Sequence, residues 1–504
     1  MKILIGKDEA CKSFSKDVLD LVYSDKETYL KIELARWLGR FLTHNFLSIY
    51  SCDEVEDYLS GLILDCSDKY KVSELPGLEF AIVATALYKH GGHTRMIEST
   101  ISAFENFDEL ILTQGFNSDR GVIEKIGLKV LLTSVEELTT SAEEKIFFIY
   151  NRLVKYKNVV LYTNPDDIEC AIAIRIDKKL NGDARKYFFV NHSDHTFSFG
   201  KTISDMVMEV SNYGWTLNRR LDLSKRQSFL GIPITTSKTL VKEDFTKKKI
   251  VLSGGAAFKF RSVGRFSLYN HLTRLMEIDE NLHIYLIGPS YITSPWLSRM
   301  KLKFPKRFYC INRVDHLSYM KLLGMASVYI DSYPITGGTA FTEALLSGLK
   351  VIGLSGCPSG YGYADQLRVG SVNNFTVTIQ NLLNDKPEEI EKQAIVRYHA
   401  RNYHGTEAFS NRLKRILRNS EIIDQETFSN NTELDYDFSD IFKIRNTVYC
   451  PDLNITTSNA FKNLLVLGLK NGLGIDFSLK LIIRWGLKKL GICVQYFKDA
   501  LRFE

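Results

Sequence analysis

The 504-residue sequence lacks any grouping of cysteines that would predict a disulfide framework or a metal centre. Its eight cysteines are scattered, with no CxxC pair and no histidine or cysteine at the spacing of zinc ligands. We therefore expect buried or free thiols in a reducing compartment.

Long apolar runs and a leader segment are also missing. No stretch of eighteen apolar residues occurs, so no bilayer-spanning helix is expected. The first six residues are followed directly by charged residues, unlike a signal peptide. A cytoplasmic protein is the expectation. The formal charge of +6 suits an anionic ligand or membrane surface but is too small to predict nucleic-acid binding.

The composition is that of a folded protein, with 45% hydrophobic and 25% charged residues, and the length allows two or three domains. Residues 1–75 predict a helical subdomain. Residues 76–240 and 250–415 each alternate strand and helix, with a polar linker at 235–249. Residues 420–504 predict an acidic connector followed by a helical tail.

Eleven short apolar runs predict the strands of two parallel sheets, because each is followed by a loop and a helical segment. The runs are 78–85, 109–113, 129–133, 158–163, 187–191 and 205–210 in the first domain, and 250–253, 283–288, 307–311, 328–331 and 350–354 in the second. The fold class is α/β, and ligands of such sheets bind beyond the carboxyl ends of the strands.

Residues 328–354 read as strand, turn, helix and strand, and the helix begins with Gly337, Gly338 and Thr339. Bare backbone N–H groups and the positive end of a helix dipole would face a ligand there, which favours a phosphate group. An isolated glycine–threonine turn is more often only a tight turn with a capping threonine.

The surrounding pattern, D-x-x-P-x-x-G-G-T-x-x-x-E-A-L-x-x-G-x-x-V-I from Asp331, resembles the donor-binding segment of GT-B glycosyltransferases. It most resembles the group of the O-linked N-acetylglucosaminyltransferases and their bacterial relatives. The resemblance implies two Rossmann-like domains facing each other across a cleft. It also implies that Gly338 and Thr339 of the turn contact the donor's diphosphate and that Glu343 holds the ribose, with Gly337 and Thr342 as further donor-binding residues.

One position departs from the large retaining GT-B family, which carries two glutamates eight positions apart. The position eight before Glu343 is Ile335, so inversion is favoured. GT-B enzymes neutralise the leaving diphosphate with cations and helix ends, and no D-x-D motif ends a predicted strand of the cleft. We therefore expect no metal and no cofactor.

Lys259 follows the first strand of the second domain after a run of small residues, Gly254 to Ala257. Small residues allow a polyanion to approach, and an ammonium supplies a point charge for its phosphates. The resemblance gives this place to a diphosphate-binding lysine or arginine. Arg261 and Arg265 are the substitutes, and a solvated surface charge is the alternative.

A strand at 187–191 runs into a loop that holds His192, Asp194 and His195. An inverting transfer needs a base near neutral pKa, and histidine is the natural candidate. His195 is the first choice and His192 the second, with Asp194 as the orienting group or the base itself. The alternative is a polar loop whose histidines are hydrogen-bonded. A metal site is less favoured, because no third ligand accompanies H-x-x-H.

The loop after the first strand carries Gly91, Gly92 and His93, followed by Thr94 and Arg95. Two glycines before a helix again offer N–H groups to an anion, and His93 is placed to contact the transferred sugar or share the base role. This G-G-H-T-R pattern, with N-H-x-D-H-x-F at the second site, resembles bacterial polysaccharide glycosyltransferases.

The tail at 477–503 predicts a helix with an apolar stripe and with Lys480, Arg484 and Lys488 at every fourth position. Such a helix either packs back onto the protein or lies on an anionic membrane.

Taken together, the sequence predicts a glycosyltransferase that moves a sugar from a nucleotide-diphosphate sugar to a glycan, lipid-linked or protein acceptor. Bacterial surface polysaccharide or glycoconjugate assembly is the expected setting. The alternatives are a nucleotide-sugar 2-epimerase of the same fold and a non-catalytic nucleotide- or glycan-binding protein. A nucleic-acid partner is not expected.

Overall fold

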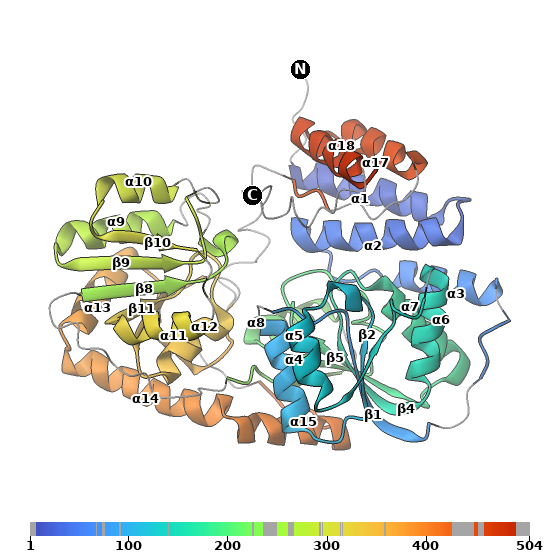
Figure 1. Ribbon diagram of the computed structural model, residues 1–504, viewed down its shortest axis with the longest axis horizontal. Helices are drawn as coiled ribbons and strands as arrows, with labels where there is room; N and C mark the ends of the chain where they lie inside the picture. Colours follow the sequence, from blue (N-terminus) through green and yellow to red (C-terminus); the bar gives the residue numbers. More distant parts are fainter. Residues whose placement is uncertain are drawn as a thin grey trace.

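The computed structural model describes residues 7–489, apart from 67, 73–75, 90–91, 140, 224–225, 235–248, 261–266, 292–293, 295, 313, 315, 357–358, 426–447 and 452–457. These residues form two α/β domains with a further layer of helices on the first one (Figure 1).

The first domain is built on seven parallel strands in the order β3-β2-β1-β4-β5-β6-β7. Side chains of successive β1 residues enter opposite cores, Ile82 on one face and Val83 on the other. Burial on both faces is why the strand reads as a continuous apolar run. The strands are β1 Leu78–Ala84, β2 Glu109–Leu112, β3 Leu131–Ser134, β4 Tyr156–Tyr162, β5 Lys186–Asn191, β6 Met206–Glu209 and β7 Gln227–Phe229.

The second domain repeats this plan with six parallel strands in the order β10-β9-β8-β11-β12-β13. In each sheet the strand order reverses beside the first strand, at β1/β4 and at β8/β11, which opens a crevice at the carboxyl edge. The strands are β8 Lys249–Gly254, β9 Leu282–Ile287, β10 Phe308–Ile311, β11 Val328–Ile330, β12 Lys350–Leu354 and β13 Arg368–Val369.

Helices cover both faces of each sheet. In the first domain α6 Ala142–Leu153 and α7 Ile168–Asn181 pack on one face, and α4 Gly92–Ala103 and α5 Arg120–Gly127 on the other. In the second, α9 Leu268–Ile278, α10 Trp296–Lys303 and α13 Val372–Leu383 oppose α11 His316–Met325, α12 Gly338–Leu346 and α14 Pro387–His404. The short helix α8 Asn212–Leu221 follows β6.

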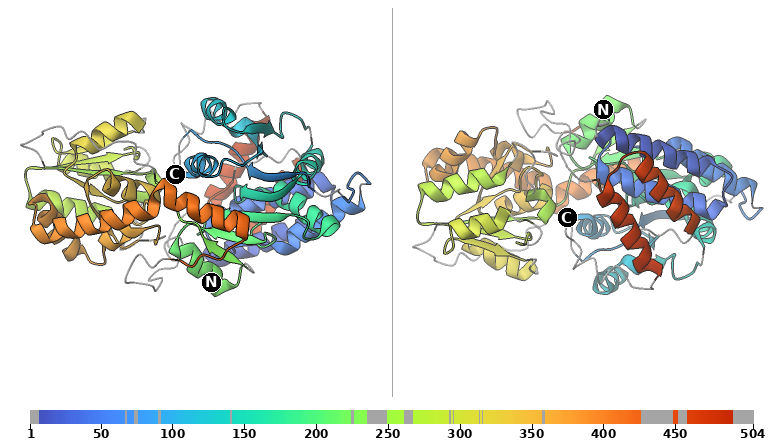
Figure 2. Two further views of the ribbon diagram at one scale, coloured as in Figure 1. Left: turned by 90° about the horizontal axis from the view of Figure 1, so that it is seen from below. Right: turned by 90° about the horizontal axis from the view of Figure 1, so that it is seen from above.

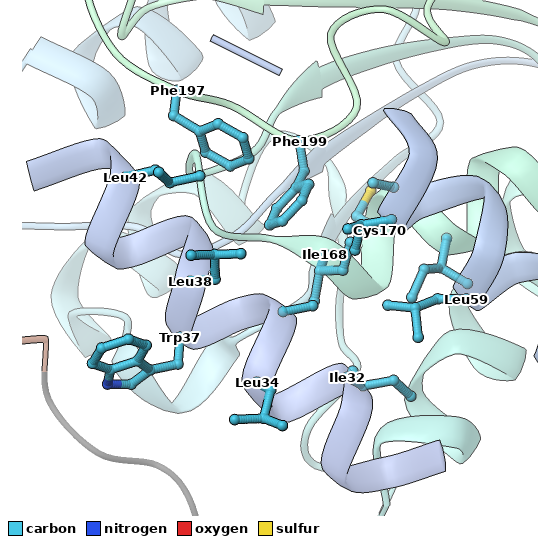
Figure 3. Close-up of a cluster of buried hydrophobic side chains, with 14 of the residues drawn as sticks. Ile32, Leu34, Trp37, Leu38, Leu42, Leu59, Ile168, Cys170, Phe197 and Phe199 are labelled. Carbon is cyan, nitrogen blue, oxygen red and sulfur yellow. The ribbon is translucent and has the colours of Figure 1, made fainter. Parts of the chain in front are cut away.

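The N-terminal segment is helical as predicted, with α1 Lys7–Tyr23, α2 Thr28–Asn45 and α3 Asp53–Asp65. Figure 3 shows Leu38 and Leu42 of α2 beside Phe197 and Phe199, which lie in the loop after β5. A Cβ at Gly39 would lie 2.6 Å from the Phe199 ring, so only glycine allows this close approach. The helical layer thus fixes the loop that carries the predicted base.

Helices α17 Ser458–Lys470 and α18 Ile475–Lys489 pack on α1 and α2 (red and blue in Figure 1). The Phe477 ring lies 5.5 Å from Phe14 and 6.2 Å from Phe41, centroid to centroid. One face of the predicted tail helix therefore packs back onto the protein. Residues 490–503 of that prediction lie outside the described part of the chain.

Helices α14 and α15 Thr406–Asn419 are separated at Gly405 and belong to different domains. Val396 and Ala400 of α14 pack in the second domain, whereas Phe409 and Leu413 of α15 pack on the first sheet. Seen from below, the two orange helices run from one domain to the other (Figure 2). The predicted domain end at 415 falls inside α15, so we place the end of the second domain at His404.

All eleven predicted strands are present, with ends shifted by no more than two residues. The two strands without a prediction are the edge strands β7 and β13. They have three and two residues, too few to give a recognisable apolar run. The predicted linker lies in 235–248, outside the described residues, except for Lys249, which begins β8.

We expect Phe477→Ala to lower the free energy of unfolding by about 3–5 kcal/mol, because a 1% exposed ring leaves a cavity between α18 and α1. The midpoint of urea unfolding measures it. Ile475→Ala is the matched control on the same helix; this side chain is 75% exposed, so its loss should cost less than about 0.5 kcal/mol. Equal effects of the two substitutions would contradict the packing of α18.

Candidate functional site

The predicted glycine turn forms the N-terminus of α12, after β11. Gly337 precedes the helix, has no side chain to cap it, and donates its own N–H to both carboxylate oxygens of Asp331 at 3.1 and 3.0 Å. A Cβ at Gly338 would lie 3.2 Å from the Tyr361 ring. Glycine therefore lets the backbone approach Tyr361 closely, at a helix end that favours anions.

Lys259 lies beside this turn, in a short helical turn (Ala257–Phe260) after β8. Its Nζ donates to the carbonyl oxygen of Thr336 at 3.0 Å, and an ammonium has three such donors. Burial lowers the pKa of Lys259, while Asp331 acts in the opposite direction. The structure thus brings the first two predicted sites together, as a half-buried cation next to a helix N-terminus.

Arg368 adds a second cation, which no sequence motif indicated. Its side chain is 5% exposed and pairs with Asp331 at 2.8 Å and with Asp365. Burial opposes its charge, but Asp365 and Asp331 together raise the pKa of Arg368. Asp331 is therefore held between Arg368 and the Gly337 N–H, which fixes the turn.

Helix α4 of the first domain faces α12 across the cleft. A Cβ at Gly92 would lie 3.9 Å from Cγ2 of Thr339, and Nη1 of Arg95 lies 3.6 Å from Oε2 of Glu343. Glu343, predicted to bind a ribose, is thus paired with the other domain. Thr342 lies one helical turn after Gly338 and is 2% exposed. Gly91 lies outside the described residues, as do Arg261 and Arg265.

His93 and His192 lie together, with ring centroids 4.5 Å apart. Because a carbonyl only accepts, Nε2 of His93 donates to Tyr162 O at 2.9 Å and Nδ1 of His192 donates to Val190 O at 3.3 Å. Burial lowers the pKa of both imidazoles, and for His192 the nearby His93 adds to the effect. Both rings are therefore neutral. Nδ1 of His93 is buried and has no hydrogen-bond partner among the described residues.

His195 forms a pair with Asp194. Nδ1 of His195 donates to Oδ1 of Asp194 at 2.9 Å, and the side chains are 26% and 1% exposed. This bond leaves Nε2 as the acceptor nitrogen of a neutral ring. His195 is the one imidazole of the three in this cleft that has a carboxylate partner among the contacts described.

Phe46 lies over the His195 ring, with centroids 6.2 Å apart and planes 18° from parallel. It follows α2 with a φ of 50°, a left-handed conformation that is costly for a bulky side chain. The helical subdomain therefore contributes to this site, which no motif in residues 1–75 indicated.

The two halves of the site also meet through the loop after β12. The N–H of Asn212, at the start of α8, donates to Gly360 O at 2.8 Å, next to the Tyr361 that lies on Gly338. The glycine-rich pattern around Gly360 was the only signal for this loop. Among the described residues, no group of three histidine, cysteine or acidic side chains is placed to hold a metal ion.

Comparison with solved structures gives similar folds at low sequence identity. A mutant O-GlcNAc transferase of Thermobaculum terrenum superposes with a TM-score of 0.54 at 12% identity, over 81% of this chain and 77% of that one. The lipopolysaccharide outer core galactosyltransferase WaaB gives 0.52 at 14%, over 68% and 100%. HepE of Anabaena, in complex with UDP and glucose, gives 0.51 at 12%, over 68% and 100%.

The chain has the GT-B fold. No family model and no curated protein sequence matches it, so the three-dimensional likeness carries this assignment. In GT-B terms, α12 and Lys259 belong to the C-terminal domain, and the three histidines belong to the N-terminal domain. The predicted fold is thereby confirmed.

We expect Lys259→Ala to weaken the binding of a nucleoside diphosphate, with UDP as the probe, by about 2–4 kcal/mol, because it removes a half-buried cation beside the anion-binding turn. Isothermal titration calorimetry measures it. Lys303→Ala in the same domain is the control, since Lys303 is 46% exposed and pairs with Glu277 at the surface. Unchanged UDP affinity in a folded Lys259→Ala protein would remove this residue from the site.

Proposed function

We propose that this chain is an inverting glycosyltransferase that uses a nucleoside-diphosphate sugar as donor. The observation that carries the proposal is the arrangement of two complementary half-sites in one GT-B cleft. A cation and a helix N-terminus lie in one domain, and a carboxylate-paired imidazole lies in the other. The two domains approach each other there, since a Cβ at Gly92 would lie 3.9 Å from Cγ2 of Thr339.

In the proposed reaction the acceptor hydroxyl attacks the anomeric carbon of the donor while Nε2 of His195 takes the hydroxyl proton. The bond between that carbon and the diphosphate oxygen breaks, and the electron pair leaves with the diphosphate. Lys259 and the N–H groups of Gly338 and Thr339 stabilise the charge that develops there. Asp194 stabilises the imidazolium, because Nδ1 already donates to its carboxylate.

The same geometry assigns different tasks to the other histidines. His192 is neutral and half-buried, with its Nδ1 bound to a backbone carbonyl, so it is a poor proton acceptor beside His195. The buried Nδ1 of His93 is an acceptor, and we assign it a hydroxyl of the transferred sugar. Glu343 would bind the ribose. The ribose hydroxyls would then either share the Glu343 carboxylate with Arg95 or displace Arg95 from it.

Two other functions remain compatible with a GT-B fold. A 2-epimerase would release a free isomerised sugar without an acceptor, and a binding protein would not turn over at all. Incubation with UDP-sugars, with and without candidate acceptors, followed by product analysis, separates these outcomes. The proposal requires sugar transfer that depends on the acceptor.

For the acceptor we propose a glycan, a lipid-linked saccharide or a glycoprotein of bacterial surface assembly. The support is the pair of motifs around His93 and His195, which resemble those of bacterial polysaccharide enzymes. No metal enters the proposed reaction, because Lys259, Arg368 and the α12 terminus supply the positive charge.

We also propose that the protein binds the inner membrane surface from the cytoplasm through α17 and α18. No helix of the described residues is long and apolar enough to cross a bilayer. Their outer faces nevertheless expose apolar side chains, among them Val466, Leu469, Leu479, Ile482 and Ile483. Lys480 and Arg484 lie on the same helix α18. This combination suits an anionic interface.

The first prediction from the proposed function concerns the catalytic base. His195→Ala should lower turnover about 10²–10⁴-fold, the usual effect of losing a general base, while UDP binding persists because the other domain holds the diphosphate. Turnover of the unmodified protein should fall on the acid side, since a protonated imidazole accepts no proton. His192→Ala is the matched comparison and should cost less. Near-full turnover of His195→Ala would show that the base is misassigned.

The second prediction concerns the membrane. The protein should co-sediment with phosphatidylglycerol vesicles at low salt and be released at high salt, because screening weakens the attraction between exposed charges. The double substitution Ile482→Asp/Ile483→Asp should abolish co-sedimentation, whereas Leu302→Asp, on the 82% exposed Leu302 of α10, should leave it intact. Co-sedimentation that survives the double substitution would exclude this surface.

A further inference from the structure

Three fully buried charged side chains lie behind the imidazole of His195, and the reaction proposed above uses only one of them. Asp194, Lys201 and Glu209 are 1%, 1% and 0% exposed. They come from the loop after β5, the turn that follows it, and the end of β6. Burial of charged groups is costly unless each is paired or hydrogen-bonded, so this cluster calls for a function.

Asp194 is held from two sides. Its Oδ1 accepts from Nδ1 of His195, and its Oδ2 accepts from the hydroxyl of Ser211. Ser211 is also the N-cap of α8, where its Oγ accepts from the N–H of Gly214 at 3.0 Å. A Cβ at Gly214 would lie 2.7 Å from Cβ of Asp194 and 2.4 Å from Oε2 of Glu209. The first turn of α8 thus lies directly on both carboxyl groups.

Glu209 is placed by strand pairing, because the β5–β6 register sets it opposite Asn191. Nδ2 of Asn191 donates to both of its oxygens at 3.1 and 2.9 Å, and Nδ2 of Asn218 donates to Oε1 at 3.0 Å. Burial raises the pKa of Glu209 to about 7, although Lys201 and Asn191 act in the opposite direction. Glu209 therefore gains or loses its proton near neutral pH.

Lys201 is the cation of the cluster. Burial lowers its pKa, and the charges of Glu209 and Asp194 oppose that effect. With Glu209 protonated, Lys201 balances Asp194 alone; with Glu209 ionised, two carboxylates share one ammonium. Asp194 connects the pair to His195, its hydrogen-bond partner, and His195 in turn acts on His192, which lies beside His93.

We propose that Lys201 and Glu209 are positioning residues for the Asp194–His195 pair: Lys201 keeps the Asp194 carboxylate ionised, Glu209 opposes this when it is itself ionised, and the two together set the pH range in which His195 accepts a proton. Lys201 favours the state in which the Asp194–His195 pair has lost its proton. Glu209 disfavours that state when it is ionised. This inference rests on the proposed function only for the catalytic use of His195.

The test is the pH titration of His195, monitored by NMR on the full chain labelled with ¹³C at Cε1 of histidine. The His195 signal is assigned as the one that disappears in His195→Gln. No substrate is needed. Lys201→Met should move the titration midpoint up by about one pH unit, because a buried cation next to the pair is lost. Glu209→Gln should move it down by less, because Glu209 already carries a proton in part of the molecules near pH 7. The His195 titration curve should be broadened in the unmodified protein by its coupling to Glu209, and Glu209→Gln should reduce it to the curve of a single proton.

Lys186→Met is the control, because Lys186 is an exposed residue at the opposite end of β5 and should leave the titration unchanged. Curves that superimpose for all variants, or that move in the same direction for Lys201→Met and Glu209→Gln, would overturn the inference. If Lys201→Met does not fold, the loss of curve broadening in Glu209→Gln still decides it.

The two proposals fail separately. If the titration responds as expected but His195→Ala keeps its turnover, the cluster tunes His195 and the base is another group. If turnover depends on His195 but the midpoint of its titration is unchanged in Lys201→Met and Glu209→Gln, the base assignment stands and this inference is wrong.

Discussion

Parallel pairing of all the described strands is the constraint on which the site depends. In a parallel sheet every strand ends at the same edge, so the loops that follow β1, β5 and β6 converge in the first domain. The loops after β8 and β11 converge in the second. Apart from Arg368 of β13 and Glu343 within α12, the residues given a role in the proposed transfer reaction therefore come from loops or helix starts at a carboxyl edge. Neither domain contains the whole set, so the proposed transfer requires the two edges to face each other.

The division of charge between the domains follows from the same constraint. The second domain contributes Lys259, Arg368 and a helix N-terminus, which suit a group that is already anionic. The first contributes imidazoles and carboxylates, which suit a hydroxyl that must lose a proton. Described contacts that join the two include Arg95 with Glu343, Asn212 with Gly360, and a buried cluster of Tyr50, Tyr213 and Leu217 with Ile335. Relative placement of the domains then decides whether donor and acceptor atoms meet.

Local sequence was sufficient for features that are local in the structure. The strands are apolar runs, the turn at Gly337 is a contiguous motif, and Asp194 pairs with the adjacent His195. The sequence alone did not predict features that depend on contacts between distant segments. Glu209 reaches Asn191 only through the β5–β6 register, Phe46 reaches His195 from a different subdomain, and Arg368 reaches Asp331 from an edge strand. The predicted domain end at 415 differs from the end placed at His404 for the same reason, because the sequence of α15 does not reveal which sheet its apolar face covers.

The break at Gly405 makes the second domain an insertion within the first. Residues 249–404 are contiguous, whereas the first domain needs α15, and its helical layer needs α17 and α18. A fragment that stops at Ile234 would leave the sheet face beneath Phe409, Leu413 and Ile416 bare. During synthesis from the N-terminus, the second domain has its complete sequence before the first one does. The chain must be synthesised beyond residue 419 before α15 can cover the sheet that leads to His195.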